Sequence, residues 1–171
     1  MTEHAKPGPT SRRFFHLRGD DRDPHTPTRQ PSRVTVLQRG LAVATAALLA
    51  VDAYVHFHDA GRYDVVTSST LSEGTLFRAQ AAVAVVVAIA LLIRPHPVVW
   101  AIAVLVAASA AGAVLLYTYV DVGALGPLPD LYEHTWARPG KRASAVAETA
   151  ATLLALAGLA VALRTRRRAV R

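Results

Sequence analysis

The chain has 171 residues, of which 52% are hydrophobic and 18% charged, and its mean hydropathy is +0.28. That mixture fits a small polytopic membrane protein with charged ends and does not fit an ordinary soluble domain. The absence of cysteine excludes disulfides, thiolate metal ligands and a cysteine nucleophile. The sequence also contains no glycine-rich phosphate loop, nucleophile elbow or zinc-protease motif, so we expect no catalytic residues.

The net charge of +7 is unevenly distributed along the chain. Fourteen of the 19 Lys and Arg residues lie in the two tails or in the turn at Arg94, whereas eight of the 12 acidic residues lie in or beside the other two connections. Because positively charged short loops stay in the cytoplasm, this distribution predicts that both termini are cytoplasmic. The excess of arginine over lysine, 17 to 2, suggests a GC-rich bacterial genome. Topology already accounts for the arginines, so we expect no nucleic-acid partner.

Residues 1–33 are rich in proline, threonine, arginine and aspartate without an apolar period, and are predicted to form a disordered basic tail. Within them, Ser11-Arg12-Arg13-Phe14-Phe15 looks like a twin-arginine export signal. Three aspartates and several prolines separate this motif from the first apolar stretch at Leu41. That separation favours an arginine-rich tail over an export signal.

Four apolar stretches, at about residues 40–57, 71–93, 97–120 and 143–163, can each cross a bilayer, which takes about 20 helical residues. They predict an all-α membrane fold, an up-down four-helix transmembrane bundle over residues 34–163. The first stretch could instead be a cleaved signal peptide, but the charged region before it is too long for that.

Local signals mark the ends of the second and third spans. Thr70-Leu71-Ser72-Glu73 has the spacing of a capping box and starts the second span. Arg94-Pro95-His96-Pro97 forces a tight cytoplasmic turn after it. The third span places Trp100 near one membrane interface and two tyrosines, Tyr117 and Tyr119, near the other.

The last part of the chain combines an outer loop, a span and a basic tail. We expect Tyr132 and Trp136 of the loop 121–141 to rest on lipid headgroups. The tail 164–171 should contact anionic membrane lipids, at about 1 kcal/mol per arginine, through Arg164, Arg166, Arg167 and Arg168. Small residues at four-residue spacing should allow close helix packing, namely Ala108 and Gly112 on the third span and Ala143, Ala147, Ala151 and Ala155 on the fourth.

Three spans carry an ionisable residue near their outer ends, and such residues cost about 3 kcal/mol or more at a bilayer centre. These residues are Asp52, Arg78 and Glu148, and His56 follows Asp52 by four positions. We therefore predict an outer-leaflet polar site of Asp52, His56, Arg78 and Glu148 that binds a small ligand, a lipid headgroup or a metal. Two alternatives remain open: Arg78 pairs with Asp52 or Glu148 only to fix helix register, or the side chains snorkel to the interface.

Helical spacing aligns further polar residues with this site. The three stripes are Asp52, His56, Asp59 and Tyr63 on the first span, Glu73, Phe77 and Gln80 on the second, and Ser144, Glu148 and Thr152 on the fourth. If two or three of them face inward, they build a polar pocket that opens to the outer surface.

The histidines of the first span raise the question of a cofactor. His56, His58 and Asp59 are residue types that bind copper or zinc. Residues two apart on a helix point about 200° away from each other, so both histidines reach one ion only if the helix has ended by Phe57. A b-type haem needs axial ligands on facing spans, and the other outer histidine, His134, lies in a loop. We therefore expect no haem, and a metal only as an alternative to no cofactor.

Several segments of the chain resemble a family of small four-span integral membrane proteins from actinobacteria that has no assigned activity. They are Asp52-Ala53-Tyr54-Val55-His56, Tyr63-Asp64, residues 72–78 (SEGTLFR) and residues 126–133 (GPLPDLYE). The resemblance covers residues 40–163 and implies a plasma-membrane protein without a known catalytic residue.

The sequence thus leaves three functions open. The first is a membrane protein with an outer-leaflet binding site. The second is a structural or accessory subunit whose charged residues only lock the bundle, with a membrane-protein partner or a second copy of the chain. The third, a small transporter, is disfavoured because no charged residue lies in the inner half of any span.

Overall fold

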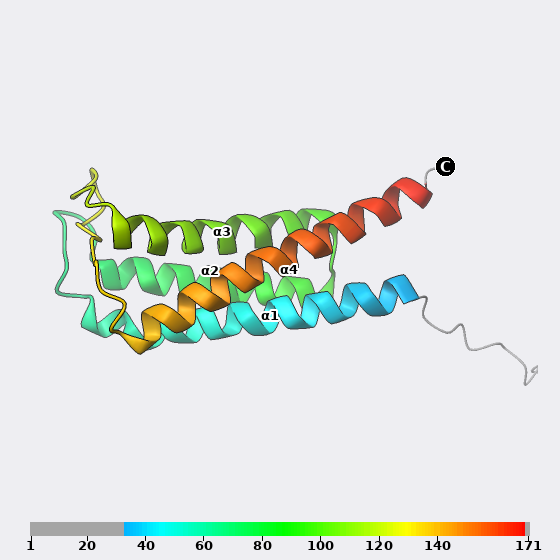
Figure 1. Cartoon of the computed structure of the whole chain (residues 1–171), viewed down its shortest axis with the longest axis horizontal. Coiled ribbons are helices and arrows are strands. Elements are labelled where there is room, and N and C mark those ends of the chain that lie inside the picture. Colours follow the sequence, from blue (N-terminus) through cyan, green and yellow to red (C-terminus); the bar gives the residue numbers. More distant parts are fainter. Residues whose placement is uncertain (1–32, 170–171) are drawn as a thin grey trace, which may run out of the picture. The chain divides into compact units, whose positions relative to one another are not determined.

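The computed structural model describes residues 33–169, which form one all-helical bundle. Its elements are α1 (Arg33–Asp59), the 3₁₀ turn η1 (Ala60–Arg62), α2 (Glu73–Ile93), α3 (Pro97–Tyr119) and α4 (Pro139–Ala169) (Figure 1). The predicted up-down four-helix bundle is therefore confirmed. The expected disordered tail lies outside the described residues up to position 32, and so does the twin-arginine motif.

The helices have two distinct ends. The start of α1, the α2–α3 turn and the end of α4 lie at one end, which we call the terminus end, and the connections 60–72 and 120–138 lie at the other, the loop end (Figure 1). α1 packs along both α2 and α4, and α3 packs along α4, whereas α2 and α3 contact each other much less. This looser seam between α2 and α3 leaves room inside the bundle.

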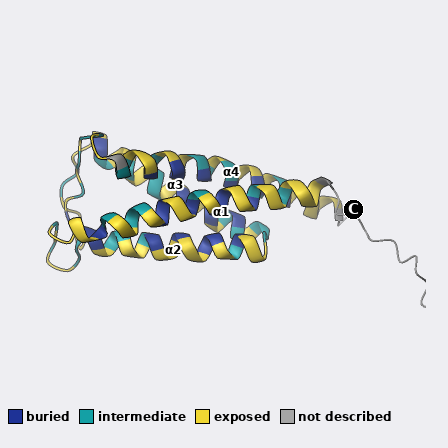
Figure 2. Ribbon diagram, turned by 90° about the horizontal axis from the view of Figure 1, so that it is seen from below, coloured by how far each residue is buried: buried dark blue, intermediate teal, exposed yellow. Residues whose placement is uncertain are grey.

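Each helix is long and apolar enough to cross a membrane. The spanning segments are Val34–Arg62, Glu73–Ile93, Pro97–Tyr119 and Gly140–Arg168, of 29, 21, 23 and 29 residues. Helices satisfy their own backbone hydrogen bonds, which a bilayer requires. Large apolar side chains such as Val86, Leu105 and Val146 are exposed. The ribbon coloured by burial shows exposed positions along the helices (Figure 2). The chain thus has the architecture of a multi-pass membrane protein.

Small residues allow the helices to pack closely, as expected for α4 but not for α3. Three alanines of the predicted α4 stripe, Ala147, Ala151 and Ala155, are buried, and Ala143 is exposed. On α3, Ala108 and Gly112 are exposed, and the buried positions are Ala103 and Ala107. The expected α3 stripe therefore lies on the outer surface of the bundle, one helical position away from the side that contacts α4.

Trp100, which the sequence places near one end of its span, lies in the first turn of α3 and is buried inside the bundle. Its side chain is 0% exposed in the core of the terminus half. A Cβ atom on Gly158 of α4 would lie 2.5 Å from the Trp100 ring. The missing side chain of Gly158 therefore provides the space for the indole, a relationship that helical periodicity within one span cannot show.

The helix ends differ from the predicted ones by a few residues. α2 is capped by Ser72 and not by Thr70, because the Ser72 hydroxyl accepts a hydrogen bond of 3.0 Å from the Thr75 N–H. α4 begins at Pro139, a residue type favoured in the first turn of a helix. It continues beyond position 163, so the arginines of the basic tail are exposed on its last turns.

Candidate functional site

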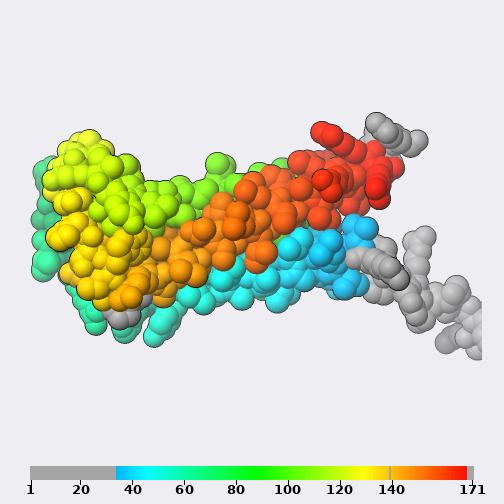
Figure 3. All heavy atoms as spheres, in the orientation of Figure 1, coloured from blue at the N-terminus to red at the C-terminus, as the bar shows by residue number. Residues whose placement is uncertain are grey.

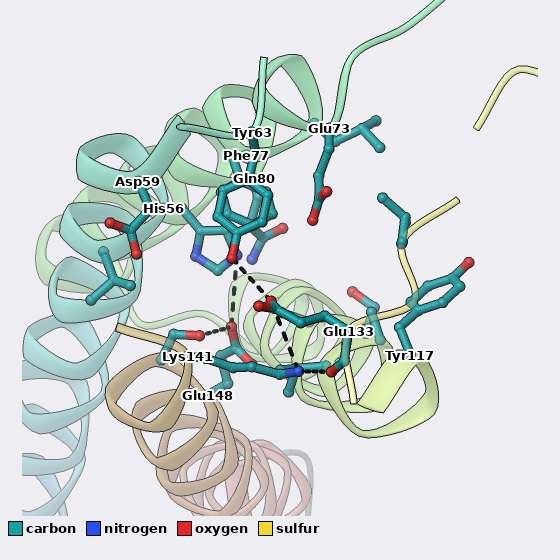
Figure 4. Close-up of a pocket in the computed structure, with 18 of the residues that line it drawn as sticks. His56, Asp59, Tyr63, Glu73, Phe77, Gln80, Tyr117, Glu133, Lys141 and Glu148 are labelled. Atoms are coloured by element: carbon teal, nitrogen blue, oxygen red, sulfur yellow. Dashed lines mark hydrogen bonds and ion pairs between the residues drawn. The ribbon is translucent and has the colours of Figure 1, made fainter. Parts of the chain in front are cut away.

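A cavity of about 430 Å³ occupies the loop half of the bundle. All four helices line it, with Tyr63 and part of the 120–138 connection completing its wall (Figure 4). In the space-filling view this connection covers the loop end, next to α3 (Figure 3). The cavity lies where α2 and α3 diverge, and Ser109 and Ala113 of α3 line it while remaining exposed.

The three predicted polar stripes meet at this cavity. Its lining includes His56, Asp59 and Tyr63 from the first stripe, Glu73, Phe77 and Gln80 from the second, and Ser144 and Glu148 from the fourth span. Asp52 lies behind His56 and is 1% exposed. Thr152, the last member of the α4 stripe, donates its hydroxyl to the Glu148 backbone carbonyl at 2.8 Å and is not a lining residue.

Asp52, His56 and Glu148 form a compact buried group. His56 Nδ1 lies 2.8 Å from Asp52 Oδ1, and Gln80 Nε2 donates to Asp52 Oδ2 at 3.2 Å. His56 Nε2 faces Glu148, whose Oε1 is 3.9 Å away. The imidazole therefore bridges two carboxylates, one on its own helix and one on α4.

Glu148 and Asp52 each have one buried carboxylate oxygen without a hydrogen-bond partner among the described residues. Its side chain is 2% exposed, and Ser144 donates a hydrogen bond to its Oε1 at 3.1 Å. Oε2 is buried and has no hydrogen-bond partner among the described residues. A buried carboxylate oxygen without a partner costs free energy, so it needs either a proton or an occupant of the cavity.

Arg78 does not join this group, contrary to the prediction. Its guanidinium donates to both carboxylate oxygens of Asp64, at 2.8 and 2.7 Å, on the exposed surface. On a helix, Arg78 points about 100° from Phe77 and 200° from Gln80, which face the cavity. Arg78 therefore cannot share their face, and the predicted ion pair with Asp52 or Glu148 is absent. Arg78 holds the pKa of the Asp64 carboxyl below its usual range through these hydrogen bonds.

The predicted metal-binding group also has different members. α1 continues to Asp59, so His56 and His58 point in different directions, and His58 is exposed and stacks on Tyr54. Asp59 forms an ion pair with Arg62, in which Asp59 Oδ1 lies 3.6 Å from the guanidinium of Arg62. Within the described part of the chain, Asp52, His56 and Glu148 are the residues whose ligand atoms lie within 4.8 Å of one another.

Sequence reasoning missed the network that closes the cavity at the loop end. Glu133 accepts a hydrogen bond of 3.0 Å from the Tyr63 hydroxyl and forms a 2.7 Å ion pair with Arg138. Lys141 donates to the Glu133 carbonyl, and the Glu133 N–H donates to the Tyr117 carbonyl at 2.9 Å. Glu133 therefore fastens the long connection to Tyr63, which directly follows η1, and to α3 and α4. The connection has no helical period, so its partners could not be assigned from spacing.

The aromatic residues of this end serve the same closure. Burial, followed by the charge of Glu133, raises the pKa of Tyr63 to about 12, so its hydroxyl stays a donor at physiological pH. Trp136, which was expected on the headgroups, donates its indole N–H to the Tyr119 hydroxyl at 3.2 Å. The Lys141 ammonium lies 5.3 Å from the centroid of the Trp136 ring. Tyr132, the other residue expected there, is 40% exposed.

The charges around the cavity are predominantly acidic. Asp59, Glu73, Glu133 and Glu148 line it, and Lys141 is the single Lys or Arg in its lining. Lys141 Nζ lies 4.0 Å from Glu133 Oε2 and forms an ion pair with it. The site can therefore hold a positively charged group better than an anion. Comparisons with protein-family models, curated proteins and solved structures gave no match, so no activity is carried to these residues from a relative.

Proposed function

We propose that the protein is a ligand-binding protein of a bacterial plasma membrane, with the cavity at the loop end as its binding site. The observation that carries the proposal is the buried, unpartnered Oε2 of Glu148 beside a cavity of about 430 Å³. The excess of carboxylates favours a small cation, such as a metal ion or the amine of a headgroup, over an anionic ligand.

The orientation follows from the charge distribution of the sequence. Both tails are cytoplasmic in this proposal, so the cavity opens toward the outer surface. The exposed arginines on the last turns of α4 then lie at the inner leaflet and attract anionic lipid. Protease cleavage of the N-terminal tail from outside intact cells would contradict this orientation.

The experiment compares cationic and anionic probes on the full chain purified in mild detergent. Thermal unfolding is followed with choline, ethanolamine or Zn²⁺ added, and with inorganic phosphate as the anionic contrast. Binding to the folded state raises the midpoint by mass action, so at least one cation should stabilise the wild type and not Glu148→Gln. Stabilisation by phosphate alone would contradict the proposed ligand class.

An accessory subunit is the second candidate function, because an ion pair with His56 and a hydrogen bond from Gln80 already hold Asp52 without any ligand. In that case the group only fixes the positions of α1, α2 and α4. A double-mutant cycle on Asp52→Asn and His56→Asn would then show strong coupling in stability, and no probe would bind. A transporter stays disfavoured, since within the described spans no ionisable residue lies between this group and Arg39 of α1 or Arg164 of α4 at the terminus end.

A further inference from the structure

We propose that His56 Nε2 and Glu148 bind a divalent first-row transition-metal ion, with Asp52 holding the imidazole in position. The inference rests on the proposed function, because the ion is one kind of positively charged occupant of the same cavity. Its starting point is that these three side chains, from α1 and α4, place ligand atoms within 4.8 Å of one another. Both carboxylates, Asp52 and Glu148, are buried inside the bundle.

The imidazole has the orientation of a metal-binding histidine. Nδ1 is hydrogen-bonded to the Asp52 backbone carbonyl at 3.0 Å and lies 2.8 Å from Asp52 Oδ1, so Asp52 favours a proton on Nδ1. The lone pair of the neutral ring then lies on Nε2, which faces Glu148 and the cavity (Figure 4). A carboxylate that fixes the tautomer and orientation of the ring is the usual outer-shell partner of a metal-bound histidine.

The distance between the two ligand atoms suits a shared ion. Zinc–nitrogen and zinc–oxygen bonds are about 2.0–2.2 Å long, so two ligands of one ion lie at most about 4.2 Å apart. His56 Nε2 and Glu148 Oε1 are 3.9 Å apart, which fits an ion between them at a wide angle. The unpartnered Oε2 offers a second carboxylate oxygen to the same ion.

Charge also favours a dication. Asp52 and Glu148 are buried together, and neither Arg78 nor Lys141 pairs with them, because Arg78 binds Asp64 and Lys141 binds Glu133. A proton would neutralise the charge of one carboxylate, whereas the charge of a divalent ion balances the charges of both. Burying two carboxylates near the membrane is otherwise costly.

The ligand types indicate the class of metal. One imidazole nitrogen with carboxylate oxygens suits Zn²⁺, Mn²⁺ or Fe²⁺ better than Cu⁺, which prefers the sulfur ligands missing from this group. Calcium and magnesium prefer all-oxygen sites. Two protein ligands leave coordination positions directed at the cavity, where water or a second ligand group completes the shell.

The test is a Zn²⁺ binding measurement on the full chain, purified in detergent and stripped with a chelator. Equilibrium dialysis followed by elemental analysis gives the zinc content per chain. We expect one Zn²⁺ in the wild type and in the matched control His58→Asn, which removes an exposed histidine two residues away. His56→Asn and Glu148→Gln should lose the ion, and Asp52→Asn should weaken binding about 10- to 100-fold.

Two results would overturn the inference. The first is zinc retained by both His56→Asn and Glu148→Gln, which would place the ion elsewhere. The second is a wild type that binds no zinc, Mn²⁺ or Fe²⁺. If His56→Asn fails to fold, Glu148→Gln decides, because it keeps the shape of the side chain. Choline or ethanolamine that still stabilises a metal-free wild type would leave the proposed function standing, whereas a protein indifferent to every cation would remove both proposals.

Discussion

The terminus half and the loop half of the bundle are packed in opposite ways. In the terminus half, Trp100 and Leu91 are fully buried among alanines, and Gly158 provides the space for the indole. The smaller cavity there, of about 330 Å³, is flanked by Arg94 and Arg166 at the end of the bundle. In the loop half, carboxylates enter the interior and the helices leave about 430 Å³ between them.

This difference separates residues that maintain the fold from residues that are available for binding. A bilayer supplies little hydrophobic force between helices, so close packing of small residues must hold them together. The terminus half provides that packing. The loop half has less of this packing around its cavity, which we propose to be a binding site.

The largest effect should follow from filling the space beside Trp100. Gly158→Val places a side chain where the indole already lies, and such overpacking costs about 3 kcal/mol. The matched control is Gly112→Val, since nothing lies within 4 Å of a Cβ at Gly112. Thermal or denaturant unfolding in detergent should show a large loss for the first variant and little change for the second. Equal losses would contradict the packing difference between the two positions.

A smaller effect is expected at the closure of the loop end. Tyr63→Phe removes the hydrogen bonds to Glu133 and from Arg138, at about 1 kcal/mol of stability. The pKa of Tyr63 is about 12 in the folded chain and 10.0 ordinarily, so the folded state keeps its proton longer. Its contribution is therefore fully present below pH 10 and is lost as the pH rises toward 12.

Unfolding midpoints of the wild type and Tyr63→Phe over this pH range measure that contribution. The two curves should run parallel at neutral pH and converge between pH 10 and 12. A gap that stays constant through pH 12 would show that the hydroxyl does not titrate in this way.

The smallest effect should come from Arg78. Its pair with Asp64 is exposed, and solvent and salt screen such pairs, so Arg78→Gln should change stability little and leave ligand binding intact. The lowered pKa of Asp64 adds stability that is lost as the pH falls through the folded-state value. A loss of cation binding in Arg78→Gln would place Arg78 back in the site, as the sequence-based prediction had it.

The fold could be predicted because the sequence features that indicate it, long apolar segments and helical spacing, are strong and lie within single segments. Apolar length defines the four spans, and helical spacing aligned the stripes that line the cavity. The same spacing indicates that Arg78 cannot share a face with Phe77 and Gln80, because it points about 100° and 200° away from them. Two contacts join residues that are far apart in the sequence: the contact of Trp100 with Gly158 and the hydrogen bond between Tyr63 and Glu133. No period within a single segment encodes such contacts, so only the packed structure shows them.

The most direct test of the account is the stability of Glu148→Gln without any ligand or metal. If Glu148 is kept for binding, its buried carboxyl with an unpartnered oxygen destabilises the empty protein. The free energy of unfolding of Glu148→Gln should then be about 1–2 kcal/mol higher than that of the wild type. The same variant should lose the stabilisation that cations give. If Glu148 is instead a lock between helices, the empty variant will be less stable than the wild type, which would contradict the assignment of the cavity as a binding site.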